Sequence, residues 1–501
     1  HAAGGDALAA PAEISFNYLG RLDLALEAEG PFAAAAESIG PDHAPESPRA
    51  HAFDVMAAVG HDGLRIECIF GTRRHERATV ERLLARMVRE LGDLAAQLRA
   101  ASAVRWTAAP SDFPLAQLDQ SQLTTVLAER AGVEDIWTLA PLQEGMLVHA
   151  QYEGVAGVYT QQLVIEIAGE VDEARLRAAW ETVMRRHAIL RVAFAWEGLP
   201  GARQVVASAV ELDWSTLDWT TQPAAEREAA WSTWLAEDRR RGFDLARAPL
   251  WRVAWARFGP TTGRLVFTHH HLLLDGWSLP LLLRDLKLAW SRQSLPAGAS
   301  YRDFVTWLTR REPAAAEAFW RRYLAGVAEA PALALGERPT PAAPGGPSHA
   351  SAKVVLEGPA HTALLRFVRQ SGLTLSTCVQ AAWGLVLSRH LGVDEAVVGV
   401  VVSGRPEDLS GADGIVGLFI NTLPLRVPAA AGEPVRAWLR RLQEDNVALR
   451  AHEASHLVDV LGWSGLPRGR ALFETALVFE NYPLGAAEEG SAAGLRFGRI
   501  S

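Results

Sequence analysis

Apolar and polar positions recur along the chain with two different periods, and together they predict a mixed α/β protein. Residues 14–20 (ISFNYLG) have strand composition, and residues 64–70 (LRIECIF) alternate apolar and polar side chains, as a half-buried strand does. Residues 80–98 instead carry an apolar stripe at helical spacing. We expect this stripe to pack into a core, and it consists of Leu83, Leu84, Met87, Leu91, Leu94 and Leu98.

The same two periods return after residue 130. Helices are predicted over residues 171–187 and 375–391, each with apolar side chains on one face. Runs rich in β-branched and aromatic residues predict strands, and they cover residues 189–196 (ILRVAFAW), 263–271 (GRLVFTHHH) and 395–403 (EAVVGVVVS).

Segments without periodicity predict the domain boundaries. Residues 100–114 are rich in Ala, Ser, Pro and Asp and are typical of an interdomain linker. Residues 328–351 are dense in Pro, Ala and Gly, which indicates a connector between two lobes. We therefore expect a first domain over residues 1–100, a linker over 101–131 and a second domain over 132–501, itself divided into an N-lobe (132–326), a connector (327–350) and a C-lobe (351–501).

A short echo links the two ends of the chain. Phe16-Asn17-Tyr18-Leu19-Gly20 resembles the segment FENYPLG at 479–485. If the echo reflects a repeated domain, the chain begins late in one domain and ends late in a related one. About 80 residues follow the first copy before the linker, whereas 20 follow the second. We therefore expect the second domain to be cut short at its C-terminus.

Composition narrows the class of protein. The formal net charge of −9 predicts no basic surface for nucleic acid. With two cysteines, Cys68 and Cys378, we expect two buried thiols, neither a disulfide nor a zinc framework. The chain opens with no signal-peptide pattern and has no apolar run of bilayer length. We expect a cytoplasmic piece of a larger protein.

The strongest chemical signal is THHHLLLDGWS at residues 268–278. Three histidines follow an apolar strand, but successive strand side chains point to opposite faces, so the three cannot converge on one metal. We therefore expect one of the three imidazoles to take part in the chemistry. We select His271, four residues before Asp275, because a neutral imidazole can accept a proton from an amine or hydrogen-bond to it. An ordinary turn with exposed histidines explains the composition equally well.

Several motifs in one order resemble the condensation-domain superfamily of non-ribosomal peptide synthetases. His270-His271 with Asp275-Gly276 resembles HHxxxDG. The other matching segments are PLQEGML at 141–147, RHAILR at 186–191, YRDFVTW at 301–307, SGRP at 403–406, GLFINT at 417–422 and LF…FENYP at 472–483. The resemblance covers residues 132–501 and implies the two-lobed α/β fold of chloramphenicol acetyltransferase. It further implies acyl transfer between two thioesters carried on phosphopantetheine arms.

The resemblance also implies roles for individual residues. His270, His271, Asp275 and Gly276 belong to the catalytic motif. Relatives pair the motif's aspartate with the arginine of SGRP, so Arg405 is the expected partner of Asp275, with Arg191 as a competing partner. Three further residues are expected to face the substrate, namely Trp277 and Ser278 along the channel and Asn421, together with the backbone N–H of Gly276, near the oxyanion.

Residues 14–100 resemble a different relative, the C-terminal end of an epimerization domain, with Tyr18 as the remaining candidate site residue. Epimerization followed by condensation implies a donor of D configuration. Expected partners are upstream and downstream carrier domains and an adenylation domain, with 4′-phosphopantetheine supplied by the carriers and no cofactor or metal bound directly. Two alternatives remain open at this point: that the main domain is itself an epimerase, or that it is a non-catalytic platform that docks carriers.

Overall fold

The protein is described by a computed structural model. The residues that the structure describes are 13–21, 51–60, 63–100, 108–153, 157–327, 333, 350–429, 432–467, 469–480 and 490–500. The chain divides into two compact units, residues 1–107 and 108–501, and each is considered by itself. Among the described residues, no helix is both long enough and apolar enough to cross a bilayer.

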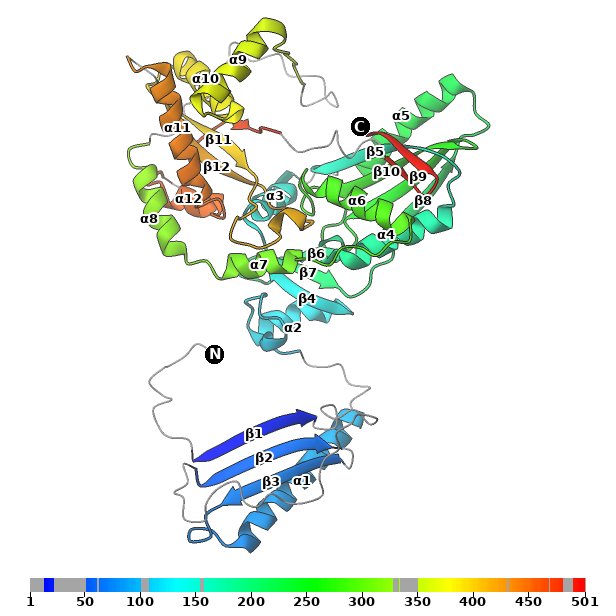
Figure 1. The fold of residues 1–501 in the computed structure, drawn as a ribbon, viewed down its shortest axis with the longest axis vertical. Helices are drawn as coiled ribbons and strands as arrows, with labels where there is room; N and C mark the ends of the chain where they lie inside the picture. Colours follow the sequence, from blue (N-terminus) through cyan, green and yellow to red (C-terminus); the bar gives the residue numbers. More distant parts are fainter. Residues whose placement is uncertain are drawn as a thin grey trace. The chain divides into compact units, whose positions relative to one another are not determined.

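In the described residues of unit 1, three strands form a sheet and one helix follows (Figure 1). Strand β1 (Ile14–Arg21) pairs in parallel with β2 (Phe53–Gly60), which forms an antiparallel hairpin with β3 (Gly63–Phe70). Helix α1 (Arg77–Ala100) follows. The strands predicted at residues 14–20 and 64–70 and the helix predicted at 80–98 are therefore confirmed.

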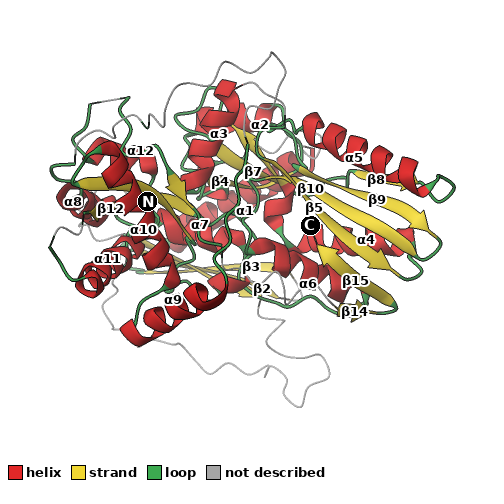
Figure 2. Ribbon diagram, turned by 90° about the horizontal axis from the view of Figure 1, so that it is seen from above, coloured by secondary structure: helices red, strands yellow, loops and turns green. Residues whose placement is uncertain are grey.

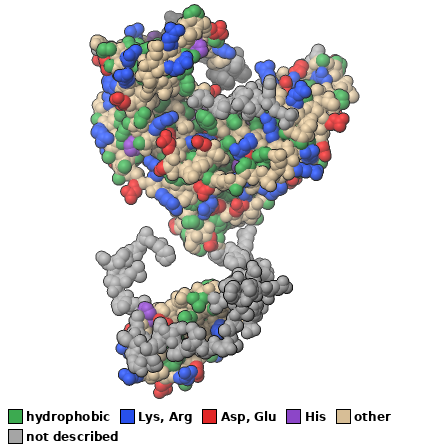
Figure 3. Space-filling model, viewed as in Figure 1, with side chains coloured by type: hydrophobic (Ala, Val, Ile, Leu, Met, Phe, Trp, Pro, Cys, Tyr) green, Lys and Arg blue, Asp and Glu red, His purple; other side chains and the backbone are tan. Residues whose placement is uncertain are grey.

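The expected burial of the helical stripe in unit 1 is wrong for its described residues. Leu83, Leu91 and Leu94 are exposed, and on β1 the side chains of Ile14 and Phe16 are exposed as well. The space-filling view shows apolar side chains on the surface of this unit (Figure 3). Periodicity therefore predicted the helix correctly but not the exposure of these side chains.

The N-lobe of unit 2 is built on a six-stranded sheet. Its strand order is β14-β15-β5-β10-β9-β8, and the strands are Gly490–Ala492, Leu495–Ile500, Thr160–Ala168, Thr262–His270, Trp251–Gly259 and Trp214–Asp218. Helices α4 (Glu173–Arg186) and α6 (Ser278–Trp290) cover one face, and α5 (Ala224–Arg241) covers the other (Figure 2). Helix α4 begins where the Asp172 carboxylate accepts the N–H of Arg175, a standard helix cap.

A smaller sheet, β4-β7-β6, extends this lobe, with strands Val133–Thr138, Arg203–Ala207 and Val192–Ala195. The expected linker over 101–131 is corrected here: residues 108–131 belong to unit 2 and include helix α2 (Gln120–Ala128). Phe113, Leu123 and Val126 are buried against Ile136 of β4. The linker was predicted from its content of Ala, Ser and Pro, and that composition gave no sign that these apolar residues would be buried. Helix α3 (Pro141–Glu153) follows β4.

The C-lobe has its own core around the sheet β12-β11-β13, whose strands are Asn421–Pro428, Glu395–Val402 and Ala476–Leu477. Helices α7 (Tyr301–Thr309) and α8 (Pro313–Tyr323) lead into the lobe. Four more helices complete it: α9 (Gly358–Ser371), α10 (Leu375–Leu391), α11 (Val435–Arg450) and α12 (Leu457–Trp463). The predicted connector (327–350) and the second copy of the echo after Glu480 lie almost entirely outside the described residues.

Two segments that were assigned to the C-lobe belong physically to the N-lobe. Strand β15 pairs with β5 of the N-lobe sheet, and Ile415, Leu418 and Phe419 are buried in the N-lobe core. The predicted boundary at 351–501 therefore describes the order of the chain but not its packing. These crossings bring the SGRP segment against the histidine motif.

Candidate functional site

The three consecutive histidines stand where β10 ends, and the first two point to opposite faces of the sheet. His269 is buried and stacks on Phe267, with ring centroids 5.0 Å apart. His270 lies instead against Phe243 and Tyr159, both edge-on. Burial lowers the pKa of His269 to about 3. The alternation is the one expected from strand geometry, and within the described part of the chain no group of residues is arranged to bind a metal.

His270 holds the loop that follows it through hydrogen bonds to the backbone. Its Nδ1 accepts the N–H of Leu272 at 3.2 Å, and its ring also hydrogen-bonds to the backbone of Val158. Burial, followed by the nearby His271, lowers the pKa of His270 to about 4, so the ring is neutral near pH 7. A buried ring held by the backbone of the loop suits a positioning role, and the expected catalytic role of His270 is corrected to that role.

His271 is the half-exposed histidine of the three. Its backbone N–H donates to Tyr159 O at 2.9 Å, and its Nδ1 lies 2.8 Å from the carbonyl oxygen of Leu274. A carbonyl oxygen can only accept, so Nδ1 is the donor in this contact. The loop therefore holds the imidazole through Nδ1 and leaves Nε2 on the other side of the ring.

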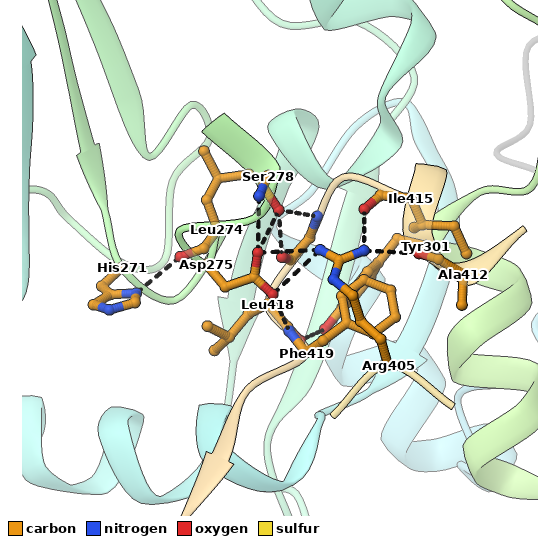
Figure 4. Close-up of polar contacts among 11 residues, drawn as sticks. His271, Leu274, Asp275, Ser278, Tyr301, Arg405, Ala412, Ile415, Leu418 and Phe419 are labelled. Carbon is orange, nitrogen blue, oxygen red and sulfur yellow. Dashed lines mark hydrogen bonds and ion pairs between the residues drawn. The ribbon is translucent and has the colours of Figure 1, made fainter. Parts of the chain in front are cut away.

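Asp275 and Arg405 form a buried ion pair between segments 130 residues apart. The Arg405 Nη2 lies 3.1 and 3.3 Å from the two Asp275 carboxylate oxygens, and the two side chains are 5% and 0% exposed. Figure 4 shows Asp275 directed toward Arg405 and away from His271. Asp275 also accepts hydrogen bonds from Ser278 and from the backbone N–H of Phe419. It organises the loop, so its place among the catalytic residues is corrected as well.

The competing partner for Asp275 is ruled out by geometry. Arg191 donates to Glu134, with Nη1 2.5 Å from its carboxylate, and to the carbonyl of Ala207. Both contacts tie the RHAILR segment to the small sheet. Arg191 therefore supports the N-lobe without touching the histidine loop.

Two expected substrate-facing residues are buried inside the scaffold. The Ser278 hydroxyl is fully buried, donates to the Gly417 carbonyl at 2.7 Å and accepts the Gly417 N–H at 3.0 Å. The Asn421 amide donates to the carbonyls of Glu453 and Ser455, so neither of its N–H groups is left for an oxyanion. Both assignments are corrected to structural roles. Gly276 and Trp277 are half-buried beside the loop, and their proposed contacts with substrate remain predictions.

Sequence reasoning missed a residue that holds the loop from helix α3. Gln143 is fully buried, and its amide donates to the carbonyl of Leu272 at 2.8 Å and to Gln204 at 3.0 Å. Its oxygen accepts the N–H of Ala140. Gln143 belongs to the PLQEGML segment at 141–147, which the sequence identified as a motif. The sequence did not indicate that its side chain would bind the Leu272 carbonyl.

Tyr159 is a second residue that was missed. It lies directly before β5, has a positive φ of 59° and contacts His149 of α3 through its hydroxyl at 3.1 Å. A positive φ is uncommon for a residue with a β-carbon and costs on the order of 1–3 kcal/mol. No sequence motif marked this position, because the conformation of one residue in a turn leaves no periodic pattern.

A pocket of about 430 Å³ lies where the lobes meet, and residues of both lobes line it. Glu144 of α3 and His456, which precedes α12, form an ion pair at its edge, 2.7 Å apart. The hydrogen bond with His456 lowers the pKa of Glu144. His271 is not among the lining residues, so this pocket is separate from the imidazole.

Two cores joined across the HHxxxDG loop, with Asp275 paired to Arg405, give residues 108–501 a two-lobed α/β architecture. The chain belongs to the condensation-domain family, whose model, described as "Condensation domain", matches residues 133–496. The condensation-domain family predicted for residues 132–501 and the two-lobed α/β fold class are thereby confirmed.

Similar proteins include long synthetases. Linear gramicidin synthase subunits C and B of Brevibacillus parabrevis are each 39% identical, over 98% and 97% of this chain. Bacitracin synthase 3 of Bacillus licheniformis is 31% identical over 94% of it. The chain spans 6%, 10% and 7% of these three proteins. It is thus similar to a small part of each.

Solved structures with the same fold have low sequence identity. The four-domain non-ribosomal peptide synthetase holo-AB3403 aligns with a TM-score of 0.61 at 19% identity, over 74% of this chain and 29% of that one. The X-domain from teicoplanin biosynthesis aligns with a TM-score of 0.60 at 24% identity, over 72% and 81%. At these identities the likeness concerns the fold.

Proposed function

We propose that residues 108–501 form a peptide bond between two carrier-bound substrates. The observation that carries the proposal is His271, a half-exposed imidazole held through Nδ1 by the Leu274 carbonyl, which leaves Nε2 for a substrate. The acceptor amine attacks the carbonyl carbon of the donor thioester. A C–N bond forms, the C–S bond breaks, and the proton of the amine passes to the departing thiolate.

His271 Nε2 orients the amine or takes its proton during the attack. The thioester is already activated, so no covalent nucleophile is required. Holding two reactants in one geometry supplies on the order of 7–11 kcal/mol of the barrier. The loop that carries His271 suits that positioning role, because it is held by the ion pair of Asp275 with Arg405 and by the hydrogen bond from Gln143.

The proposed partners are an upstream and a downstream carrier domain, each presenting its substrate on a 4′-phosphopantetheine arm, and an adenylation domain of the same synthetase. Similarity to parts of long synthetases supports this arrangement. We also propose that the reaction takes place in the cytoplasm.

The direct experiment incubates the 501-residue chain with one carrier loaded with a donor aminoacyl group and another loaded with an acceptor. We expect a dipeptide on the acceptor carrier, detected by intact-protein mass spectrometry. A chain that binds both carriers but yields no dipeptide would instead support the docking-platform alternative. Racemisation of a single loaded substrate would support the epimerase alternative.

For unit 1 we propose the C-terminal part of an epimerization-type domain. Its order of strand, hairpin and long helix, its exposed apolar residues such as Phe16 and Leu94 and the extent of the matches to the gramicidin synthases support a fragment of a larger domain. The condensation unit would then take a donor of D configuration. Loading the donor carrier with D- or L-aminoacyl groups tests this: we expect the D donor to react faster, and equal rates would contradict it.

A further inference from the structure

We infer that Tyr159 is a positioning residue of the condensation site, which holds His271 in place through its own backbone carbonyl. This inference rests on the function proposed above. Tyr159 O accepts the N–H of His271 at 2.9 Å, at the point where β5 and β10 begin to separate. Tyr159 makes this contact in a backbone conformation with a φ of 59°, so we expect the position of its carbonyl to depend on that conformation being held.

The side chain of Tyr159 stabilises this uncommon backbone conformation. Its hydroxyl lies 3.1 Å from His149 Nδ1, with the two rings edge-on at 5.6 Å, and its ring lies edge-on to His270 at 6.1 Å. His149 belongs to α3, the helix from which Gln143 holds the carbonyl of Leu272. Helix α3 therefore fixes the histidine loop at two places, through Gln143 and through Tyr159.

A role through the backbone makes a prediction that a substrate-contacting role does not. Glycine adopts positive φ without strain, whereas alanine does not. Tyr159→Gly keeps the carbonyl in place without needing the anchor to His149. Tyr159→Ala loses the anchor but keeps the strain, so the turn relaxes and the carbonyl leaves the His271 N–H. The smaller residue should therefore be the better tolerated of the two.

The test compares Tyr159→Ala, Tyr159→Gly and Tyr159→Phe in the full chain with loaded carriers. We expect Tyr159→Ala to lower kcat by about tenfold, the factor that corresponds to the strain of one left-handed residue. Tyr159→Gly and Tyr159→Phe should each stay within about threefold of the wild type, and KM should change little throughout. Wild-type kcat in the alanine variant, or a glycine variant as impaired as the alanine variant, would overturn the inference.

A matched control is available at Arg292, an exposed residue after α6 with a φ of 56°. Arg292→Ala and Arg292→Gly change the same kind of strain at the other end of α6 from the histidine motif. We expect both to leave kcat unchanged. A drop in kcat in Arg292→Ala that Arg292→Gly does not share would show that strain at any turn affects the rate, and would overturn the assignment to Tyr159.

A second measurement does not depend on activity. In chain labelled with ¹⁵N-histidine, the signals of His271 are identified by their loss in His271→Ala, and their shifts report which ring nitrogen carries the proton. We expect the Nδ1–H form in the wild type and in Tyr159→Gly, and a mixture in Tyr159→Ala. The same spectrum in all three would overturn the inference. Full dipeptide formation by His271→Ala would instead refute the proposed role of His271 and leave this measurement intact.

Discussion

The carboxylate of Asp275 and the guanidinium of Arg405 form an ion pair although the two residues are 130 positions apart in sequence. Both side chains are almost completely shielded from water. Arg405 also donates to the carbonyls of Ala412 and Ile415. One side chain therefore fixes the histidine loop to the segment that follows SGRP. That segment is packed into the N-lobe core. The ion pair therefore holds together two parts of the chain that are far apart in sequence.

Asp275→Ala should reduce both stability and activity. Removing one member of a buried pair leaves the other charge uncompensated and costs roughly 3–5 kcal/mol. The urea concentration at the unfolding midpoint and the rate of dipeptide formation should both fall. Asp218→Ala is the control, because its pair with Arg257 is about half exposed and should contribute far less to stability than a buried pair. Loss of activity at unchanged stability would indicate that Asp275 takes a direct part in the chemistry.

His271→Ala should abolish dipeptide formation and leave the melting temperature almost unchanged, because the ring is half-exposed and its Nδ1 contact is with the backbone of its own loop, at Leu274. His361→Ala, at an exposed position on α9, should change neither quantity. Dipeptide formation at the wild-type rate in His271→Ala would contradict the catalytic assignment.

The free energy of unfolding should fall as the pH falls below about 6.5. Burial lowers the pKa of His270 to about 4 in the folded chain, whereas an unfolded histidine titrates near about 6.5. Between these values the unfolded chain binds more protons, so the loss approaches about 1.4 kcal/mol per pH unit. His270→Gln should be less stable at neutral pH yet lose less on acidification. Equal slopes of the urea midpoint against pH in both proteins would contradict the burial argument.

Glu453→Gln should stabilise the protein above about pH 7. Burial raises the pKa of Glu453 to about 7 despite nearby arginines, so the native state favours the protonated carboxyl. Stability from this group is complete below the unfolded pKa and is lost as the pH rises through the folded one. We expect the variant to gain about 1–2 kcal/mol at alkaline pH, after allowing for partial exposure, and little near about pH 4. A pH-independent difference would refute this cause.

Gln143→Leu should destabilise the histidine loop. The change removes the partners of the Leu272 carbonyl and of Gln204, and each buried polar group left unsatisfied costs about 1–3 kcal/mol. Gln151→Leu, at an exposed position on the same helix, controls for the loss of an amide from α3. Hydrogen exchange should show faster opening of residues 270–275 in Gln143→Leu, and unchanged exchange there would contradict the proposed support.

Much of the local structure could be predicted from residue order. The helix predicted at 375–391 has the observed bounds of α10, and the strand ending in the histidines differs from β10 by one residue at each end. The motif around Asp275 indicated the correct loop, and the resemblance to relatives indicated its partner Arg405. These features depend on contacts within a few residues, or on a motif that persists across a family.

Tertiary structure decided the rest. Ser278, Asn421 and His270 have residue types suited to a substrate channel, yet all three are turned into the scaffold, because their partners come from segments distant in sequence or from a turn of the backbone. The conformation of Tyr159 and the pairing of β15 with β5 likewise follow from packing. Side-chain periodicity encodes which face of an element is apolar, but which group meets that face depends on how the whole chain closes around it.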